Sequence, residues 1–209
     1  MIIIIDIETG SSKDALEFKP IFKANGTLKD PEKIKRDLEM KDNEWEQKTA
    51  LNALTAEILA IGYLEEHLQD KPLLMHGNEL DILKNFWETY TASMELGFTI
   101  VGHYNKAFDF PMIIRRSYKH GIPIVKSILE KYNPQIVDLS EVWSLNSYPK
   151  ENISLDNLCK YLGVEGKSGS GKDFAKLFKD ESTKQIALDY LIQDLQCTFE
   201  CAKRLTNLN

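Results

Sequence analysis

The N-terminal segment of the chain constrains its fold more than any other stretch. Residues 2–5 are all isoleucine, and such a β-branched run is typical of a central strand that is covered on both faces. Asp6, Ile7 and Glu8 follow at once. Because side chains alternate along a strand, Asp6 and Glu8 share one face. Two carboxylates about 4 Å apart repel by roughly 4 kcal/mol at an effective dielectric of about 20, and a divalent cation would offset that repulsion. The alternative is a strand end that runs into a solvated turn.

The rest of the chain alternates between strand-like and helix-like stretches, which predicts an α/β fold. Asp30 followed by Pro31 is typical of a helix start, with Asp30 as the N-cap. We expect a mixed central β-sheet flanked by α-helices, one domain over residues 1–209, and a helical insertion at about residues 16–53 after the first strand. Further strands are predicted over residues 57–64, 72–75, 98–101 and 135–137, and helices over residues 30–51, 109–119, 155–162, 172–178 and 183–205, with another that begins at Asn78.

The composition is ordinary for a globular protein and argues against several classes of function. The net charge of −6 argues against a protein that wraps a long nucleic-acid duplex, because that requires a basic surface. No apolar stretch is long enough to span a membrane, and the first residues lack the features of a signal peptide. Cys159, Cys197 and Cys201 form neither a zinc-binding pattern nor a disulfide framework, so we expect buried thiols. These features predict a cytoplasmic protein with no membrane partner.

A second acidic stretch, Asn105-Lys-Ala-Phe108-Asp109, lies between a predicted strand and a predicted helix. The sheet would bring this stretch to the edge where Asp6 lies. The alternative for Asp109 is a helix N-cap, since Pro111 suits the first turn of that helix.

A third acidic stretch lies on the last predicted helix. Tyr190 and Asp194 are four residues apart, so the phenol and the carboxylate share one helix face. The alternative is a half-buried tyrosine beside a surface aspartate. Asp138 also follows a predicted strand, but no partner is evident in the sequence and we expect a structural role.

Taken in order, these stretches resemble the three motifs of the DEDD family of 3′–5′ exonucleases. The tyrosine marks the DEDDy branch, which includes the proofreading domains of family B DNA polymerases; the histidine branch would carry histidine where this chain has Asp189. Tyr104, which separates His103 from Asn105, departs from the family pattern. Nearly the whole chain is similar to stand-alone polymerase-B-like exonucleases of bacteria and their phages, through Asp30-Pro-Glu-Lys-Ile, Ala50-Leu-Asn-Ala-Leu-Thr, Val101-Gly-His, Ile153-Ser-Leu-Asp-Asn and Gly166-Lys-Ser-Gly.

The resemblance implies a ribonuclease H-like fold and a metal-dependent 3′–5′ exonuclease. It implies that two divalent ions, Mg²⁺ or Mn²⁺, are held by Asp6, Glu8, Asp109 and Asp194, and oxygen ligands suit both ions. Four carboxylates would balance the charge of two such ions. Tyr190 would position the attacking water, since a phenol with a pKa of about 10 is a poor base at neutral pH.

The resemblance also implies a substrate. It is the 3′ end of single-stranded nucleic acid, with DNA favoured over RNA, and the products are nucleoside 5′-monophosphates. Thr9 and Gly10 would approach the terminal nucleotide with backbone groups, Phe108 would line its pocket, and Asn105 is a further candidate for substrate binding. Replication or repair proteins are candidate partners. Two alternatives stay open: a catalytically idle nucleic-acid or protein-binding module of the same fold, and a ribonuclease H-type endonuclease.

Overall fold

The computed structural model describes residues 1–68, 71–130, 132–145, 151–166 and 173–206. The chain divides into two compact units, and each is described by itself. The main unit comprises Met1–Glu8 and Ile58–Asn209, and the insertion unit comprises Thr9–Glu57. The description of residues 1–209 as a single domain stays a prediction. No helix of the described residues is both long enough and apolar enough to cross a membrane.

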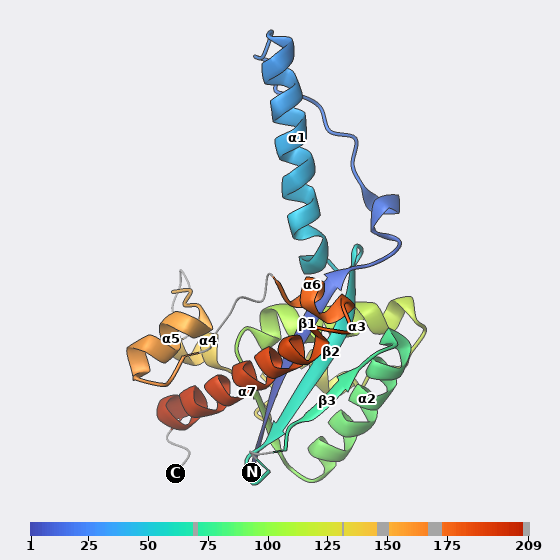
Figure 1. Cartoon of the computed structure of the whole chain (residues 1–209). Helices are drawn as coiled ribbons and strands as arrows, with labels where there is room; N and C mark the ends of the chain where they lie inside the picture. Colours follow the sequence, from blue (N-terminus) through green and yellow to red (C-terminus); the bar gives the residue numbers. More distant parts are fainter. Residues whose placement is uncertain (69–70, 131, 146–150, 167–172, 207–209) are drawn as a thin grey trace. The chain divides into compact units, whose positions relative to one another are not determined.

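Within the described residues, five strands form one mixed sheet in the order β3-β2-β1-β4-β5 (Figure 1). β1 pairs in parallel with β4, and β4 pairs in parallel with β5, whereas β2 and β3 are antiparallel. The predicted central strand is confirmed: each isoleucine of residues 2–5 is at most 4% exposed. Because the three parallel strands end at the same edge of the sheet, the residues that follow them gather there. The strand bounds are β1 Ile2–Ser11, β2 Ala56–Glu65, β3 Leu73–His76, β4 Thr99–Gly102 and β5 Ile136–Asp138.

Helices of the main unit flank this sheet, and α7 crosses β1 and β2 in Figure 1. The packing of α7 on β2 is close, because a Cβ atom at Gly62 would lie 2.7 Å from Leu195 Cδ1. Local signals set the ends of two helices: the Asn78 side chain accepts from the Leu80 N–H, and Gly163 ends α5 with a φ of 64°. The bounds are α2 Glu79–Glu95, α3 Phe110–Lys119, α4 Leu139–Trp143, α5 Leu155–Leu162, α6 Phe174–Lys179 and α7 Lys184–Thr206, with the short helices η3 Asn105–Asp109 and η4 Lys126–Leu129.

A buried ion pair joins α2, α3 and β2. Arg116, whose side chain is 2% exposed, donates from Nε and Nη2 to the two carboxylate oxygens of Glu79 at 2.8 and 2.6 Å. His120 Nε2 and the backbone N–H of Ile58 also lie 2.8 Å from this carboxylate. Burial by itself raises the pKa of Glu79, but the hydrogen bonds from Arg116, His120 and Ile58 outweigh it, so the pKa lies below its ordinary value. Glu79 is therefore a largely buried charge with Arg116 as its counter-charge.

The insertion unit is built around α1 (Pro31–Lys48), with the short helices η1 (Ala15–Phe18) and η2 (Thr49–Leu51) on either side of it in sequence. The predicted cap is confirmed, since the Asp30 side chain accepts from the Glu32 N–H at 2.9 Å and Pro31 occupies the first turn. No residue of α1 is buried. Loop contacts complete the unit: Lys41 Nζ donates to the Lys23 carbonyl oxygen at 2.8 Å and to Asp37 at 2.7 Å.

The structure differs from the predicted helices at three places. The prediction missed α4, and the helix expected from Asp109 begins at Phe110, after a π-helical turn. The alternative of Asp109 as an N-cap is wrong, because its side chain makes no capping hydrogen bond. The helix expected over residues 172–178 is α6, and its predicted first residue, like the rest of residues 167–172, lies outside the described residues.

The cysteines are free thiols buried in the core. Cys159 Sγ and Cys201 Sγ lie 3.6 Å apart between α5 and α7. Burial raises the pKa of Cys159 to about 12, with a further contribution from Cys201. Such thiols behave as small apolar side chains.

Candidate functional site

Three carboxylates converge at the edge where β1 leaves the main unit. Ligand oxygens of Asp6, Glu8 and Asp194 all lie within 4.8 Å of one another. The first two come from β1, two residues apart on one strand face, and the third comes from α7, where it is 5% exposed. Among the described residues, this is the one group of three or more acidic, histidine or cysteine side chains with metal-ligand spacing. The structure thus brings together residues that are 188 positions apart, counted from Asp6 to Asp194.

Asp109 lies near this group. It is 3% exposed, and its Oδ2 atom is buried without a hydrogen-bond partner in the described parts of the chain. Burial raises the pKa of Asp109 well above its ordinary value, and the charges of Asp6 and Asp138 raise it further. A buried carboxylate oxygen with no donor, beside another carboxylate, is suited to bind a cation.

Tyr190 lies one helical turn before Asp194 on α7 and is 8% exposed. Its ring belongs to an apolar cluster that includes Leu59, Phe174 and Phe178. Tyr190 and Asp194 therefore share one face of the helix, its buried side, as their spacing of four residues predicts. The apolar packing fixes the ring and so fixes the direction of the phenol.

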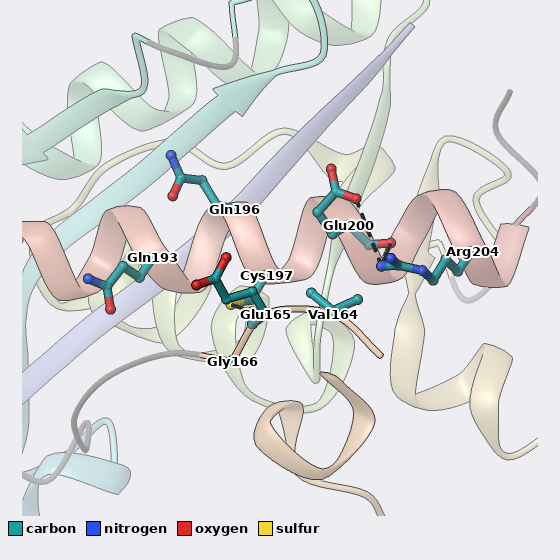
Figure 2. Close-up of a pocket in the computed structure, with 8 residues that line it drawn as sticks. All are labelled: Val164, Glu165, Gly166, Gln193, Gln196, Cys197, Glu200 and Arg204. Atoms are coloured by element: carbon teal, nitrogen blue, oxygen red, sulfur yellow. Dashed lines mark hydrogen bonds and ion pairs between the residues drawn. The ribbon is translucent and has the colours of Figure 1, made fainter. Parts of the chain in front are cut away.

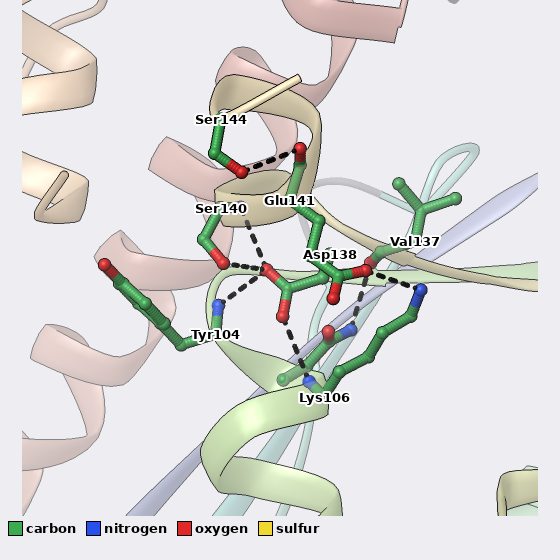
Figure 3. Close-up of polar contacts among 8 residues, drawn as sticks. Tyr104, Lys106, Val137, Asp138, Ser140, Glu141 and Ser144 are labelled. Carbon is green, nitrogen blue, oxygen red and sulfur yellow. Dashed lines mark hydrogen bonds and ion pairs between the residues drawn. The ribbon is translucent and has the colours of Figure 1, made fainter. Parts of the chain in front are cut away.

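The turn that carries Asp109 has an unusual backbone. Tyr104 has a φ of 63°, in the left-handed region, and Asn105–Asp109 form a single π-helical turn. Figure 3 shows the carboxylate of Asp138 at the start of this turn, where it accepts the backbone N–H groups of Tyr104 and Lys106. His103, the residue before Tyr104, contacts another loop: its Nε2 atom lies 2.9 Å from the carbonyl oxygen of Ile153.

The residues predicted to contact substrate lie in different surroundings. Asn105 is fully buried, and its Nδ2 donates to the Val137 carbonyl oxygen at 3.1 Å. Phe108 is half-buried. Thr9 and Gly10 belong to the insertion unit, where the Thr9 hydroxyl donates to the Ala50 carbonyl oxygen at 2.7 Å and Gly10 is buried. Their roles toward substrate stay predictions.

Asp138 is the residue of this region whose contacts sequence reasoning missed. Besides the turn, its Oδ1 atom accepts from the N–H and the hydroxyl of Ser140 at 2.9 and 2.7 Å and so caps α4. The signal was present as Asp138-Leu-Ser140, a pattern typical of a helix N-cap. The expectation of a structural role fits these contacts, but the sequence did not reveal the contact with residues 104–106.

A pocket lies beside α7, on the same helix as Tyr190 and Asp194 (Figure 2). Its volume is about 580 Å³, and it lies between the helix and Val164–Gly166. Among the described residues of its lining, Glu165, Glu200 and Arg204 are charged, and Arg204 is within 3.8 Å of Glu200.

The donor set fits divalent metal ions. Carboxylate oxygens are the ligands that Mg²⁺ and Mn²⁺ prefer, and Mg²⁺ needs few of them because it retains several waters. The cluster offers the three close carboxylates of Asp6, Glu8 and Asp194, and Asp109 adds a buried oxygen without a donor. These carboxylates are suited to hold a divalent cation, and one buried oxygen of Asp109 has no hydrogen-bond donor among the described residues.

The sheet order and the flanking helices define a ribonuclease H-like α/β fold, with an acidic cluster at the end of its central strand. Residues 67–206 match the family described as "Predicted 3'-5' exonuclease related to the exonuclease domain of PolB", and the chain belongs to that family. The matched region contains Asp109, Tyr190 and Asp194, whereas Asp6 and Glu8 precede it.

A solved structure supports the same fold. The family B DNA polymerase from the hyperthermophilic archaeon Pyrobaculum calidifontis is similar, with a TM-score of 0.65 and 14% sequence identity. The match covers 98% of this chain and 24% of that polymerase, so the chain spans about a quarter of its length. No curated protein matches the sequence.

Proposed function

We propose that this chain is a metal-dependent 3′–5′ exonuclease that removes nucleotides from the 3′ end of single-stranded nucleic acid. The observation that carries the proposal is the convergence of Asp6, Glu8 and Asp194 within 4.8 Å, in a chain that belongs to a family of predicted exonucleases. We propose DNA as the substrate ahead of RNA. The products are nucleoside 5′-monophosphates.

Two divalent ions, Mg²⁺ or Mn²⁺, would be held by Asp6, Glu8, Asp194 and Asp109. When bound, such ions neutralise phosphate charge, lower the pKa of a bound water and stabilise the leaving oxygen. The protein contributes the arrangement: β1 and α7 fix three carboxylates, and the π-helical turn fixes the fourth. Asp109 is suited to this role because burial, together with the charges of Asp6 and Asp138, makes it costly to leave ionised without a cation.

Tyr190 orients the attacking water and does not abstract its proton. Its phenol donates or accepts a hydrogen bond in a fixed direction because the ring is packed in an apolar cluster. Thr9 and Gly10 present backbone groups to the terminal nucleotide, Phe108 lines its pocket, and Asn105 supports that side of the site. We place the protein in the cytoplasm, with replication or repair proteins as candidate partners.

The test is digestion of 5′-labelled single-stranded DNA and RNA of the same sequence, with Mg²⁺, with Mn²⁺ and with EDTA. We expect a ladder that shortens from the 3′ end, faster on DNA, and no products in EDTA. The Asp6→Asn variant should be inactive, and Tyr190→Phe should slow hydrolysis while its binding of Mn²⁺ in calorimetry stays unchanged. Internal cuts in an RNA–DNA hybrid would identify a ribonuclease H-type endonuclease instead. Binding without hydrolysis would identify an idle binding module.

A further inference from the structure

The carboxylate of Asp138 joins two parts of the acidic edge of the sheet. It ends β5 and is 2% exposed. On one side it accepts from the N–H and hydroxyl of Ser140, at the start of α4, and on the other from the N–H groups of Tyr104 and Lys106 at 3.0 and 3.1 Å (Figure 3). Four donors on one carboxylate leave little capacity for another ligand. Asp138 is therefore not suited to be a further metal ligand.

Asp138 and Asp109 are two buried aspartates with opposite surroundings. Each is at most 3% exposed, and the charge of Asp138 acts on Asp109. Asp138 has four hydrogen-bond donors, while Asp109 Oδ2 has none in the described residues. Asp138, which accepts four hydrogen bonds, thus holds the backbone of the turn that carries Asp109.

We propose that Asp138 is a positioning residue that fixes the π-helical turn Asn105–Asp109, and that through this turn it sets the affinity of the Asp109 end of the site for a divalent cation. The proposal rests on the proposed function for its consequence in catalysis, but cation binding can be measured without hydrolysis.

The backbone of the turn shows why it needs a brace. A non-glycine residue in the left-handed region and an isolated π-helical turn are both conformations that a chain adopts only when its surroundings determine them. The two amide groups that Asp138 binds belong to Tyr104, the left-handed residue itself, and to Lys106, the second residue of the turn. Asp138 thus holds the first residues of the turn, and Asp109 is the last residue of the same turn.

A second contact braces the same turn from β4. A Cβ atom at Gly102 would lie 2.8 Å from Asn105 Cβ and Nδ2, so only glycine leaves room for the buried Asn105 side chain. Asn105 in turn donates to the Val137 carbonyl oxygen, in the strand that ends at Asp138. Gly102→Ala would therefore disturb the turn through Asn105 rather than through the hydrogen bonds of Asp138, which is its neighbour on β5.

The test is Asp138→Asn, which keeps the size of the side chain. Its oxygen can keep the Oδ1 position, where three donors meet, and its NH₂ group then faces the Lys106 N–H, where donor meets donor. We expect Mn²⁺ to bind about 10–100-fold more weakly in calorimetry, as for other residues that support a ligand. The half-saturating Mn²⁺ concentration for hydrolysis should rise by the same factor, while the KM for DNA stays unchanged and kcat recovers at saturating Mn²⁺.

The matched control is Glu141→Gln. Glu141 accepts from Lys106 Nζ at 3.0 Å and so ties the same two segments, but it leaves the hydrogen bonds of Asp138 intact. This variant should bind Mn²⁺ as the wild type does, and Gly102→Ala should weaken binding as Asp138→Asn does. Unchanged Mn²⁺ affinity in both Asp138→Asn and Gly102→Ala, in folded protein, overturns the inference. A wild-type protein that binds Mn²⁺ but does not hydrolyse DNA overturns the proposed function alone. The comparison of Mn²⁺ affinities among the variants then still tests the role of Asp138.

Discussion

Two buried carboxylates of the main unit, Glu79 and Asp109, show how surroundings decide what a charge does. Glu79 receives hydrogen bonds from Arg116, His120 and the Ile58 amide, and its pKa is lowered. Asp109 has burial and two acidic neighbours as the causes of its raised pKa. The charge of Glu79 is balanced within the protein and contributes to the stability of the fold. The charge of Asp109 has no such partner at its Oδ2 atom among the described residues, and on the proposed function a bound cation would supply it.

The largest expected effect is on the acidic cluster. Asp194→Asn should lower kcat/KM by about 10³-fold or more, because the loss of several kcal/mol of metal-dependent stabilisation is a loss of that size. The measurement is the initial rate of release of nucleotides from single-stranded DNA. The matched control is Asp189→Asn on the same helix, since Asp189 is exposed and accepts only a hydrogen bond from Gln185 in the contacts described. Equal losses in both variants would contradict the assignment of Asp194.

The next largest effect is on the stability that the ion pair of Glu79 and Arg116 provides. Arg116→Met should lower the free energy of unfolding by about 3–5 kcal/mol, because it leaves the buried Glu79 carboxylate without its main partner. Urea denaturation measures this change. Arg115→Met removes an exposed arginine from the same helix and should have little effect. Adding Glu79→Gln to Arg116→Met should restore part of the stability; if it does not, packing rather than charge is the cause.

A smaller effect, of opposite sign for Asp109 and Asp138, is expected on the free energy of unfolding. Asp109→Asn should raise the free energy of unfolding by about 1 kcal/mol in EDTA, since it removes a charge that its neighbours repel. Asp138→Asn should lower that free energy by about 1–2 kcal/mol, since its NH₂ group would face the Lys106 N–H and leave that donor without an acceptor. Thermal unfolding with EDTA measures both. Changes of the same sign would show that the two carboxylates do not differ as described.

The smallest effect is the pH dependence of Glu79. Its pKa is lower in the folded protein than in the unfolded chain, so the stability it contributes is fully present above the ordinary glutamate pKa of about 4.3. That contribution is lost as the pH falls through the lowered pKa of the folded protein. The difference in unfolding free energy between wild type and Glu79→Gln should therefore shrink from neutral pH toward acid pH. A difference that stays constant would exclude this linkage.

The sequence predicted the parts of the fold that local patterns determine. The isoleucine run of residues 2–5 predicted a buried strand, and the cap residue Asp30 predicted the start of α1, because each effect lies within a few neighbouring residues. The joint position of Asp6, Glu8 and Asp194 followed from the family resemblance, and the place of Asp109 near Asp6 followed from the rule that parallel strands end at one edge.

The parts that the sequence did not reveal depend on distant contacts. The π-helical turn at Asn105–Asp109 has no local pattern, since it is held by Asp138, more than thirty residues away in the chain. The ion pair of Glu79 and Arg116 joins residues 37 positions apart, and neither residue is unusual in its local sequence. The interior contacts of the insertion unit were likewise not predicted, because α1 has no buried face that a hydrophobic pattern would reveal.

Gly62 on β2 has a consequence for how this protein can change. A methyl group there would meet the side chains of Leu191 and Leu195 on α7, at 3.2 and 2.7 Å. Leu195 adjoins Asp194 in sequence, so side-chain growth on a neighbouring strand displaces the helix that supplies an acidic ligand of the cluster. Selection for nuclease activity would then act on an apolar position that no substrate touches.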